Sequence, residues 1–335
     1  MAVANVLLFK RNKMRALKFQ QTGSLDNLKI ENVPKPVPAS DEVLVQVKAA
    51  AINPSDVKNV LGNMHETTVP RIPGRDFAGI VVEGPNTWTG KSVFGSGGNL
   101  GFSRDGTHAE FAVVPLIAIN PMPRNLSFEQ AAAMGVAYMT AWAAVVTTAK
   151  IQPGETILIT GTSGAVGGAA AKIAMKQGAR VIGTSRKAAE VPGLKNPAVA
   201  EWVGLDAGDL RESIFAATKG KGVDVVFDVI GGAMFEPCLR SLALRGRHIA
   251  IASNPDPRVS FNLVDFYHRE SRLFGVDSVK LSFQESADIL RGLTPGIEDG
   301  TFPPPTIKSR SFADFAEAYR LVGEGKSKEK QILVP

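Results

Sequence analysis

The chain has 335 residues, of which 44% are hydrophobic and 21% are charged. These proportions exclude a disordered or fibrous protein, and the length predicts two globular domains. The single cysteine, Cys238, excludes an intramolecular disulfide framework and favours a reducing compartment such as the cytoplasm. The net charge of +6 is small for this length, and charges of both signs are interspersed, so nucleic acid is not a favoured partner.

The N-terminus is basic and free of acidic residues. Lys10, Arg11, Lys13, Arg15 and Lys18 follow a short apolar run, which is the reverse of the order in a secretory signal. We interpret residues 1–13 as a leader or as the product of an upstream start codon. The alternatives are organelle targeting and a basic arm that binds RNA.

The N-terminal part is predicted to be mainly β. Its apolar residues alternate with polar ones over short runs, and glycine-rich or proline-rich loops separate these runs. The predicted strands are 16–19, 28–30, 43–48, 79–83 and 109–114.

After Pro123 the pattern changes to alternating helices and strands, which predicts a parallel, doubly wound sheet. Residues 131–149 carry no charge and are long enough to span a membrane, but their Ala-rich and Thr-rich composition favours a buried helix. A closing strand at 331–334 is expected to rejoin the N-terminal domain. The other predicted elements are a helix from Ser127, strands 156–160, 180–183, 223–229 and 247–252, and helices 165–177, 233–243, 283–291 and 312–322.

The segment from Thr156 to Met175 indicates a dinucleotide-phosphate site. An apolar strand leads into a glycine turn, and an Ala-rich helix follows. Glycines let the backbone approach a pyrophosphate, and the helix N-terminus attracts the anion. The spacing is G-x-x-G-x-x-G, so a purely structural turn is the alternative. The residues predicted to contact the phosphates are Gly161, Ser163, Gly164, Ala165, Val166 and Gly167.

The next predicted strand, 180–183, leads through Thr184 into Ser185, Arg186 and Lys187. A hydroxyl and two cations favour a ribose 2′-phosphate, and therefore NADPH, over the free 2′-hydroxyl of NADH. A solvated basic loop is the alternative. Two further strands end near Ile230–Gly231 and Ser253–Asn254, where backbone groups are expected to hold the nicotinamide end of the cofactor. Structural turns are again the alternative.

Several motifs occur here in an order that resembles the medium-chain dehydrogenase/reductase superfamily. They are Asn53–Asp56, Ile72–Val81, Thr140–Trp142, the glycine run, Phe227–Gly232 and Gly246–Ile249. The resemblance is strongest to the zinc-independent quinone oxidoreductase and enoyl reductase branch. It implies an α/β protein with a GroES-like, mainly-β catalytic domain (1–135 and 279–335) and a doubly wound Rossmann NADP-binding domain (136–278). It also implies a homodimer.

The zinc ligands of related dehydrogenases have no counterparts in the corresponding motifs. These positions carry Asn53-Pro-Ser and Arg75-Asp76, so no metal is expected and Lewis-acid oxidation of alcohols is not favoured. The predicted chemistry is hydride transfer from NADPH to a small hydrophobic quinone or α,β-unsaturated carbonyl compound.

The resemblance also implies individual roles. Asn53 is expected near the nicotinamide ribose and the substrate, with a turn residue before Pro54 as the alternative. Thr140 is expected to contact the phosphate or nicotinamide side of the cofactor. Enoyl thioester reductases have a proton-donating tyrosine where this chain has Met64, which weighs against that activity. His65 is adjacent and is a candidate proton donor, although water or a loop histidine without a role would also fit. A different class of function is an NADPH-binding structural or RNA-binding protein.

Overall fold

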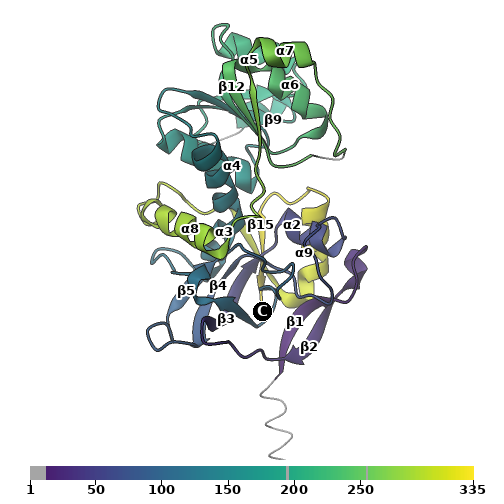
Figure 1. Cartoon of the computed structure of the whole chain (residues 1–335), viewed down its shortest axis with the longest axis vertical. Coiled ribbons are helices and arrows are strands. Elements are labelled where there is room, and N and C mark those ends of the chain that lie inside the picture. The colour runs from purple at the N-terminus through teal and green to yellow at the C-terminus, as the bar shows by residue number, and fades with distance from the viewer. Residues whose placement is uncertain (1–12, 194–195, 254–255) are drawn as a thin grey trace, which may run out of the picture. The chain divides into compact units, whose positions relative to one another are not determined.

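The computed structural model describes residues 13–193, 196–253 and 256–335 (Figure 1). The chain divides into two compact units. The first contains both ends of the chain, Met1–Val136 and Val279–Pro335, and the second is Ala137–Ser278. The basic residues Lys10 and Arg11 lie outside the described residues.

The first unit is mainly β. Strands β1 (Lys13–Phe19) and β2 (Leu28–Pro34) form an antiparallel pair, joined by a short 3-10 turn, η1 (Leu25–Asn27). The larger sheet has the order β14 (Ile307–Ser311), β15 (Lys330–Val334), β3 (Glu42–Ala51), β4 (Phe77–Glu83), β5 (Ser92–Gly95) and β7 (Ile119–Pro121), and β6 (Phe111–Pro115) also pairs with β3. The C-terminal strand β15 pairs antiparallel with β3, which confirms that it rejoins the N-terminal part.

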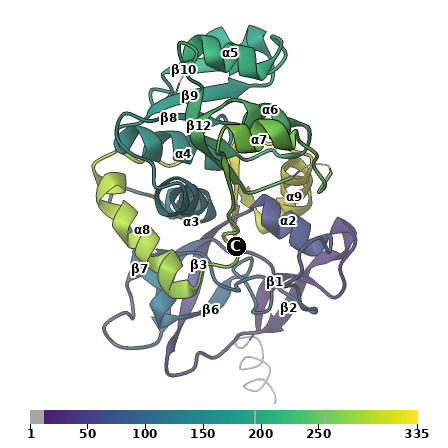
Figure 2. The same cartoon turned by 45° about the horizontal axis from the view of Figure 1, so that its top comes forward.

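Alternation of side chains explains strand β3. Val43, Val45 and Val47 occupy alternate positions, so all three point to one face of the sheet, where they join a buried apolar cluster with Phe77 and Val81. Helices α2 (Pro54–Val60) and α9 (Phe315–Gly323) pack together (Figure 2). Helix α8 (Phe283–Glu298) begins with a capping box, and the short turns η2 (Leu116–Ala118) and η6 (Phe312–Asp314) complete this unit.

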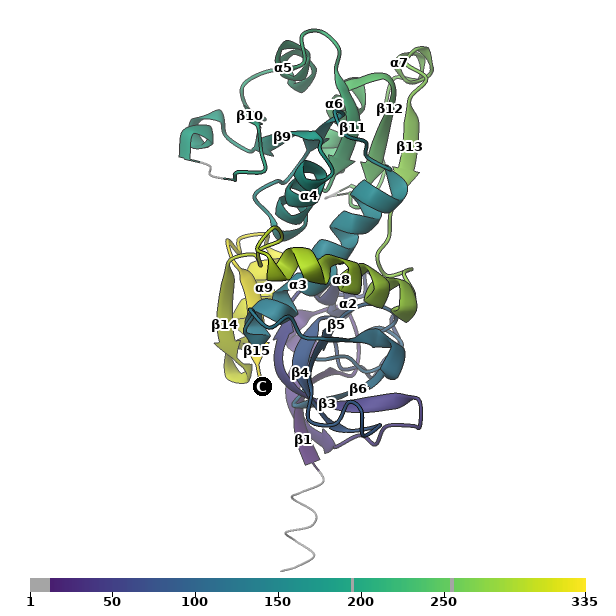
Figure 3. The same cartoon turned by 90° about the vertical axis from the view of Figure 1, so that its left-hand side faces the viewer.

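The second unit contains a six-stranded sheet in which every strand is parallel to its neighbours. The strands follow one another across the sheet, as most of their labels show in Figure 3. Their order is β10 (Glu201–Gly204), β9 (Arg180–Ser185), β8 (Thr156–Ile159), β11 (Val223–Asp228), β12 (Leu242–Ala250) and β13 (Arg272–Gly275). A parallel sheet of this kind, with helical connections, is the predicted doubly wound architecture.

Helices cover this sheet. Leu158, Ile182 and Val226 share one apolar cluster with residues of the helices α5 (Leu210–Ala217) and α6 (Phe235–Arg240). Neighbouring strand residues point to the opposite face, and helix α4 (Ala165–Lys176) contacts β8 and β9. The remaining helical segments are η4 (Ala188–Gly193), η5 (Gly232–Met234) and α7 (Leu263–His268).

Helix α3 (Phe128–Trp142) continues as the π-helix η3 (Ala143–Thr148). By length and composition it could cross a membrane, but 78% of its most apolar window is buried inside the protein. The segment is therefore a core helix, as its Ala-rich composition predicts.

Several predicted boundaries were wrong; helix α8, for example, ends at Glu298 and not at residue 291. The helix expected over 233–243 ends at Arg240, because Leu242 already pairs with Val223 at the start of β12. The register then shifts, with Arg247 opposite Val225, and Arg245 takes a left-handed conformation with φ 63°. Strand β9 runs two residues further than expected and includes Ser185.

Candidate active site

The glycine loop follows β8 and leads into α4. Gly161 has φ 59°, and a Cβ atom at this position would lie 2.6 Å from Val229 Cγ2. A Cβ atom on Gly167 would lie 2.4 Å from the Gly161 carbonyl oxygen. Both positions therefore require glycine, since backbone and packed side chains leave no space for a larger residue.

The N-terminus of α4 has the features of an anion site. Its N-cap residue, Gly164, is extended and has no side chain that could cap the helix. The N-cap therefore leaves the first N–H groups of the helix available to a ligand. Ser163 and Gly164 are exposed, and Ala165 and Val166 are half-buried. The loop thus presents backbone donors and a helix dipole at an accessible surface, as a pyrophosphate would require.

Thr162 ties this loop to the end of β9. Its hydroxyl donates to the Ile159 carbonyl at 2.6 Å and accepts from the Thr184 amide at 3.1 Å. At the same strand end Ser185 is buried, whereas Arg186 and Lys187 are exposed. The hydrogen bond between Thr162 and Thr184 therefore connects the glycine loop to the strand end that carries the residues predicted to bind the 2′-phosphate.

Asp228 joins the glycine loop to the segment predicted to hold nicotinamide. Its Oδ1 atom accepts from Thr160 Oγ1 at 2.9 Å and from the amides of Ile230 and Gly231 at 3.1 Å and 3.0 Å. The Val229 amide donates to Thr160 Oγ1 at 2.9 Å. One buried carboxylate oxygen thus fixes the ends of the two adjacent strands β8 and β11.

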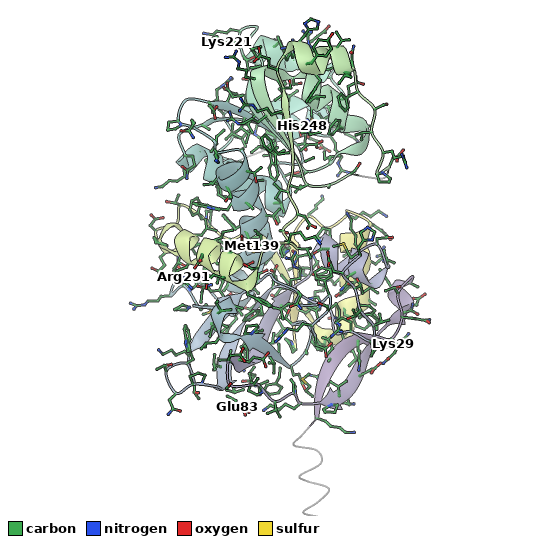
Figure 4. The ribbon with its side chains drawn as sticks, in the orientation of Figure 1. Lys29, Glu83, Met139, Lys221, His248 and Arg291 are labelled. Atoms are coloured by element: carbon green, nitrogen blue, oxygen red, sulfur yellow. The ribbon has the colours of Figure 1, made fainter. Side chains whose placement is uncertain are left out.

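His248, on strand β12, lies next to this carboxylate. Its Nε2 atom lies 3.5 Å from Asp228 Oδ2, and both side chains are fully buried. Burial alone would raise the pKa of Asp228, but His248 and the Gly231 and Ile230 amides hold it below its ordinary value. In Figure 4, His248 lies in the interior of its unit, whereas Lys221 extends from the surface.

The end of β12 approaches the same segment. A Cβ atom on Gly231 would lie 2.1 Å from the Ala252 carbonyl oxygen, and the Gly232 amide donates to Ser253 Oγ at 3.2 Å. Ile230, Gly231 and Ser253 therefore belong to one hydrogen-bonded cluster with Asp228. Asn254, which was predicted to contact the cofactor, lies outside the described residues.

Two buried hydroxyls support a ligand in this unit. Thr140 Oγ1, on α3, and Thr184 Oγ1, at the end of β9, have no hydrogen-bond partner in the part of the chain that the structure describes. Buried polar atoms are normally satisfied, so each is suited to a partner that the protein itself does not supply. Together with the glycine cradle, these residues fit a dinucleotide.

In the first unit, Asn53 lies in a buried polar network. Its Nδ2 atom donates to Asp76 Oδ2 at 2.9 Å, and Lys330 Nζ donates to its Oδ1 atom. Its backbone amide donates to Asp56 Oδ2 at 2.7 Å. This geometry fixes the amide of Asn53 in one orientation, with the oxygen toward a cation and the nitrogen toward a carboxylate.

Asp76 is held from several sides. Its Oδ1 atom accepts from Ser96 Oγ at 2.5 Å and from the Val136 amide at 2.9 Å. Its Oδ2 atom lies 3.9 Å from Lys330 Nζ. A carboxylate with so many donors is a stable anchor for the side chain of Asn53.

Burial shifts the titration of this network. Desolvation raises the pKa of Asp56 to about 6 and lowers that of Lys330, although Asp76 and Asp56 oppose the lowering at Lys330. His108 shares a 2.6 Å hydrogen bond with the Tyr319 hydroxyl, and burial lowers its pKa to about 4. His108 is therefore neutral near pH 7.

His65 stands apart from this network. It is exposed in a turn, and it forms no hydrogen bond or ion pair with the described residues. The structure therefore adds no support to its predicted role as a proton donor, which remains a prediction. Lys330, by contrast, was not anticipated, because the contact joins residues 277 positions apart and no local motif marks it.

The comparisons with known proteins agree with this architecture. Residues 39–124 match the family profile of the alcohol dehydrogenase GroES-like domain, and residues 165–291 match the profile of zinc-binding dehydrogenases. A zinc-type alcohol dehydrogenase-like protein of Schizosaccharomyces pombe is 35% identical over 86% of each chain. The quinone oxidoreductase of Mus musculus is 29% identical over 96% of this chain and 97% of its own.

A solved structure described as an NAD-dependent alcohol dehydrogenase matches 96% of this chain and all of its own, with a TM-score of 0.86 and 28% identity. The GroES-like domain and the Rossmann-like sheet together define a two-domain oxidoreductase. The chain belongs to the medium-chain dehydrogenase/reductase superfamily, in its quinone oxidoreductase branch. The predicted family and fold class are confirmed.

Although one matched profile is that of zinc-binding dehydrogenases, the residues around Asn53 do not fit zinc. Zinc takes thiolate, imidazole or carboxylate ligands, but Asp76 is accompanied here by an amide and by the Lys330 ammonium, which would repel a second cation. Over residues 13–193, 196–253 and 256–335, no group of three or more His, Cys, Asp or Glu side chains is placed to hold a metal.

Proposed function

We propose that this protein is an NADPH-dependent reductase that transfers hydride, without a metal ion, to quinones or α,β-unsaturated carbonyl compounds. The observation that carries the proposal is the Lys330–Asn53–Asp76 chain, which supplies hydrogen-bond donors and a positive charge in the catalytic domain instead of metal ligands. The match to a quinone oxidoreductase over nearly the whole chain supports it.

The bound cofactor would supply the hydride. Asn53 would orient the acceptor, because its amide nitrogen has a second hydrogen besides the one given to Asp76. Lys330 would stabilise negative charge that develops on a carbonyl or quinone oxygen hydrogen-bonded to that amide. Quinones and enones accept hydride readily, so this modest electrostatic assistance is sufficient.

Ser185, Arg186 and Lys187 support the preference for NADPH. A 2′-phosphate pairs best with cationic and hydroxyl donors, and these three residues follow one another at the end of β9. Replacement of both Arg186 and Lys187 by alanine should weaken NADPH binding far more than NADH binding. An equal effect on both cofactors would contradict the assignment.

An acceptor panel tests the proposed reaction. The protein would be mixed with NADPH or NADH and with 1,4-naphthoquinone, trans-2-hexenal or 1-octen-3-one, and oxidation of the cofactor followed at 340 nm. We expect NADPH to be consumed with at least one acceptor. The absence of turnover with every combination would remove the basis for the reductase.

Trans-2-enoyl thioesters belong in the same panel, because enoyl reduction is the second candidate activity. Met64 cannot donate a proton, so we expect slower turnover of the thioester than of the quinone. Faster turnover of the thioester would favour the enoyl reductase instead.

We also propose that the protein forms a homodimer through strand β13. This strand is the edge of the parallel sheet, and an unpaired edge can pair with that of a second copy. Exposed apolar side chains occur on and near it, namely Leu244, Leu263, Val264, Tyr267 and Leu273. Light scattering after gel filtration should give twice the chain mass, and a proline in place of Phe274 should reduce it.

A further inference from the structure

The corner after strand β9 contains a carboxylate among its basic residues. Ser185 Oγ donates to Glu190 Oε2 at 3.2 Å. The turn η4 returns the chain to this point, and the Glu190 amide donates to the Lys187 carbonyl at 3.1 Å. Glu190 therefore accepts a hydrogen bond from the same hydroxyl that would donate to a bound 2′-phosphate.

The turn that carries Glu190 is anchored on both sides. The Ala188 amide donates to Asp206 Oδ1 at 2.6 Å, and the Leu205 amide donates to the Ser185 carbonyl at 2.8 Å. A Cβ atom on Gly204 would lie 2.4 Å from Ala188 Cα, so only glycine there allows the turn to pack so closely. These contacts hold the turn against the strand and keep Glu190 next to Ser185.

The contact has opposite consequences for the two nicotinamide cofactors. A serine hydroxyl has one proton to donate, and in this structure Glu190 accepts it. A 2′-phosphate would compete for this proton and would be repelled by the carboxylate. A ribose 2′-hydroxyl, by contrast, can itself donate to an acidic side chain at the end of this strand.

We propose that Glu190 is a specificity-determining residue that limits the preference for NADPH given by Arg186 and Lys187, so that the protein also uses NADH. The inference rests on the proposed function, since it requires a dinucleotide at the glycine loop. The exposed cations of Arg186 and Lys187 attract the 2′-phosphate, whereas the Glu190 carboxylate, which is hydrogen-bonded to Ser185, repels it. The balance between them sets the ratio of the two affinities.

The test uses the full-length protein and measures dissociation constants for NADPH and NADH by quenching of protein fluorescence. Calorimetry measures the dissociation constants of 2′,5′-ADP and 5′-AMP as well. These two ligands differ only in the 2′-phosphate, and their binding can be measured without turnover. Glu190→Gln removes the charge and keeps the size of the side chain. Glu212→Gln is the matched control, since Glu212 is an exposed carboxylate in the first turn of α5 in the same unit.

We expect Glu190→Gln to bind NADPH and 2′,5′-ADP about fivefold more tightly, with NADH and 5′-AMP unchanged or weaker, because an exposed like-charge contact is removed. Glu212→Gln should leave both ratios unchanged. Glu190→Asp, which keeps the charge but shortens its reach, should fall between wild type and Glu190→Gln.

An unchanged ratio in Glu190→Gln, in protein that binds both cofactors, would overturn the role of Glu190 and leave the reductase intact. An equal gain in Glu212→Gln would overturn it as well, because the effect would then be one of overall charge. Failure of the wild-type protein to bind either dinucleotide would overturn the proposed function, and this inference with it.

Discussion

Asn53 Nδ2 donates a hydrogen bond to Asp76 Oδ2 at 2.9 Å, although the two residues are 23 positions apart in the sequence. Asn53 precedes helix α2, and Asp76 precedes strand β4. Lys330 completes the chain from the start of β15. Three segments distant in sequence thus fix one amide, and this rigidity is what a hydrogen-bond donor for a reacting oxygen needs.

Lys330→Met should damage both stability and activity. Its ammonium is buried beside Asp76 and Asn53, and its removal takes away a cation that lies 3.9 Å from a buried carboxylate oxygen. We expect the free energy of unfolding to fall by about 3 kcal/mol, and kcat to fall more than the affinity for NADPH.

Lys326→Met is the matched control for this change. Lys326 is 69% exposed and pairs with Glu324 on the surface of the same unit. Its replacement should cost less than about 1 kcal/mol. Urea unfolding and steady-state kinetics would measure both variants, and similar losses in the two would show that burial of Lys330 has no special importance.

Asp56 gives the stability a definite dependence on pH. Burial raises its pKa to about 6, above the value of about 3.9 expected in an unfolded chain. Between these pH values the folded protein holds a proton that the unfolded chain has lost, so this group lowers stability as the pH rises through the window. His108 acts in the opposite sense, because its folded pKa of about 4 lies below its unfolded value.

Asp56→Asn isolates the contribution of this carboxyl. The amide oxygen can still accept from the Asn53 amide, and the buried charge at position 56 is removed. At pH 7 the variant should be more stable by about 1 to 3 kcal/mol, with the difference from wild type vanishing toward pH 4. Urea unfolding from pH 4 to 7 would measure it, with the exposed Asp41→Asn as a control. A difference that does not change with pH would contradict the assigned pKa.

The nucleotide-binding unit was largely predictable because its signals are local. Gly161 and Gly167 lie in one short segment, and the apolar strand before them and the Ala-rich helix after them occur in the expected places. The order of strand, turn and helix is set by neighbours in the sequence. Strand β12 was placed wrongly at its start, since its pairing with Val223 depends on a register shift that the sequence pattern does not reveal.

The polar network around Asn53 was not predictable in the same way. Lys330 looks like one surface lysine among several near the C-terminus, and only the pairing of β15 with β3 brings it to Asn53. The contact between Ser185 and Glu190 was missed for a related reason. The cations beside Ser185 are adjacent in sequence, whereas Glu190 reaches it only through the turn η4.

Thr160→Val should weaken cofactor binding without unfolding the protein. The hydroxyl of Thr160 donates to Asp228 and accepts from the Val229 amide, so its loss frees the ends of two strands. We expect the dissociation constant of NADPH to rise about tenfold, equivalent to about 1.4 kcal/mol. Thr160→Ser keeps the hydroxyl and should bind NADPH nearly as wild type does. Fluorescence titration would compare them, and equal weakening in the two variants would rule out the hydrogen bond as the cause.

Two adjacent glycines of helix α4 offer a sharp contrast. A Cβ atom on Gly167 would lie 2.4 Å from the Gly161 carbonyl oxygen, and this contact is with backbone that cannot move aside without opening the loop. On Gly168 the nearest such atom is the Thr162 carbonyl oxygen at 3.4 Å, an ordinary contact distance. We therefore expect Gly167→Ala to destabilise the unit by about 2 kcal/mol and to weaken NADPH binding more than Thr160→Val does.

Gly168→Ala should instead stabilise the protein by about 0.5 to 1 kcal/mol, because alanine restricts the unfolded chain and favours helix. Thermal unfolding followed by circular dichroism, with and without NADPH, would measure the pair. Equal effects of the two substitutions would show that the loop can relax around a Cβ atom. A loss confined to Gly167→Ala, and larger in the presence of NADPH, would support close approach of the backbone to the cofactor at this one position.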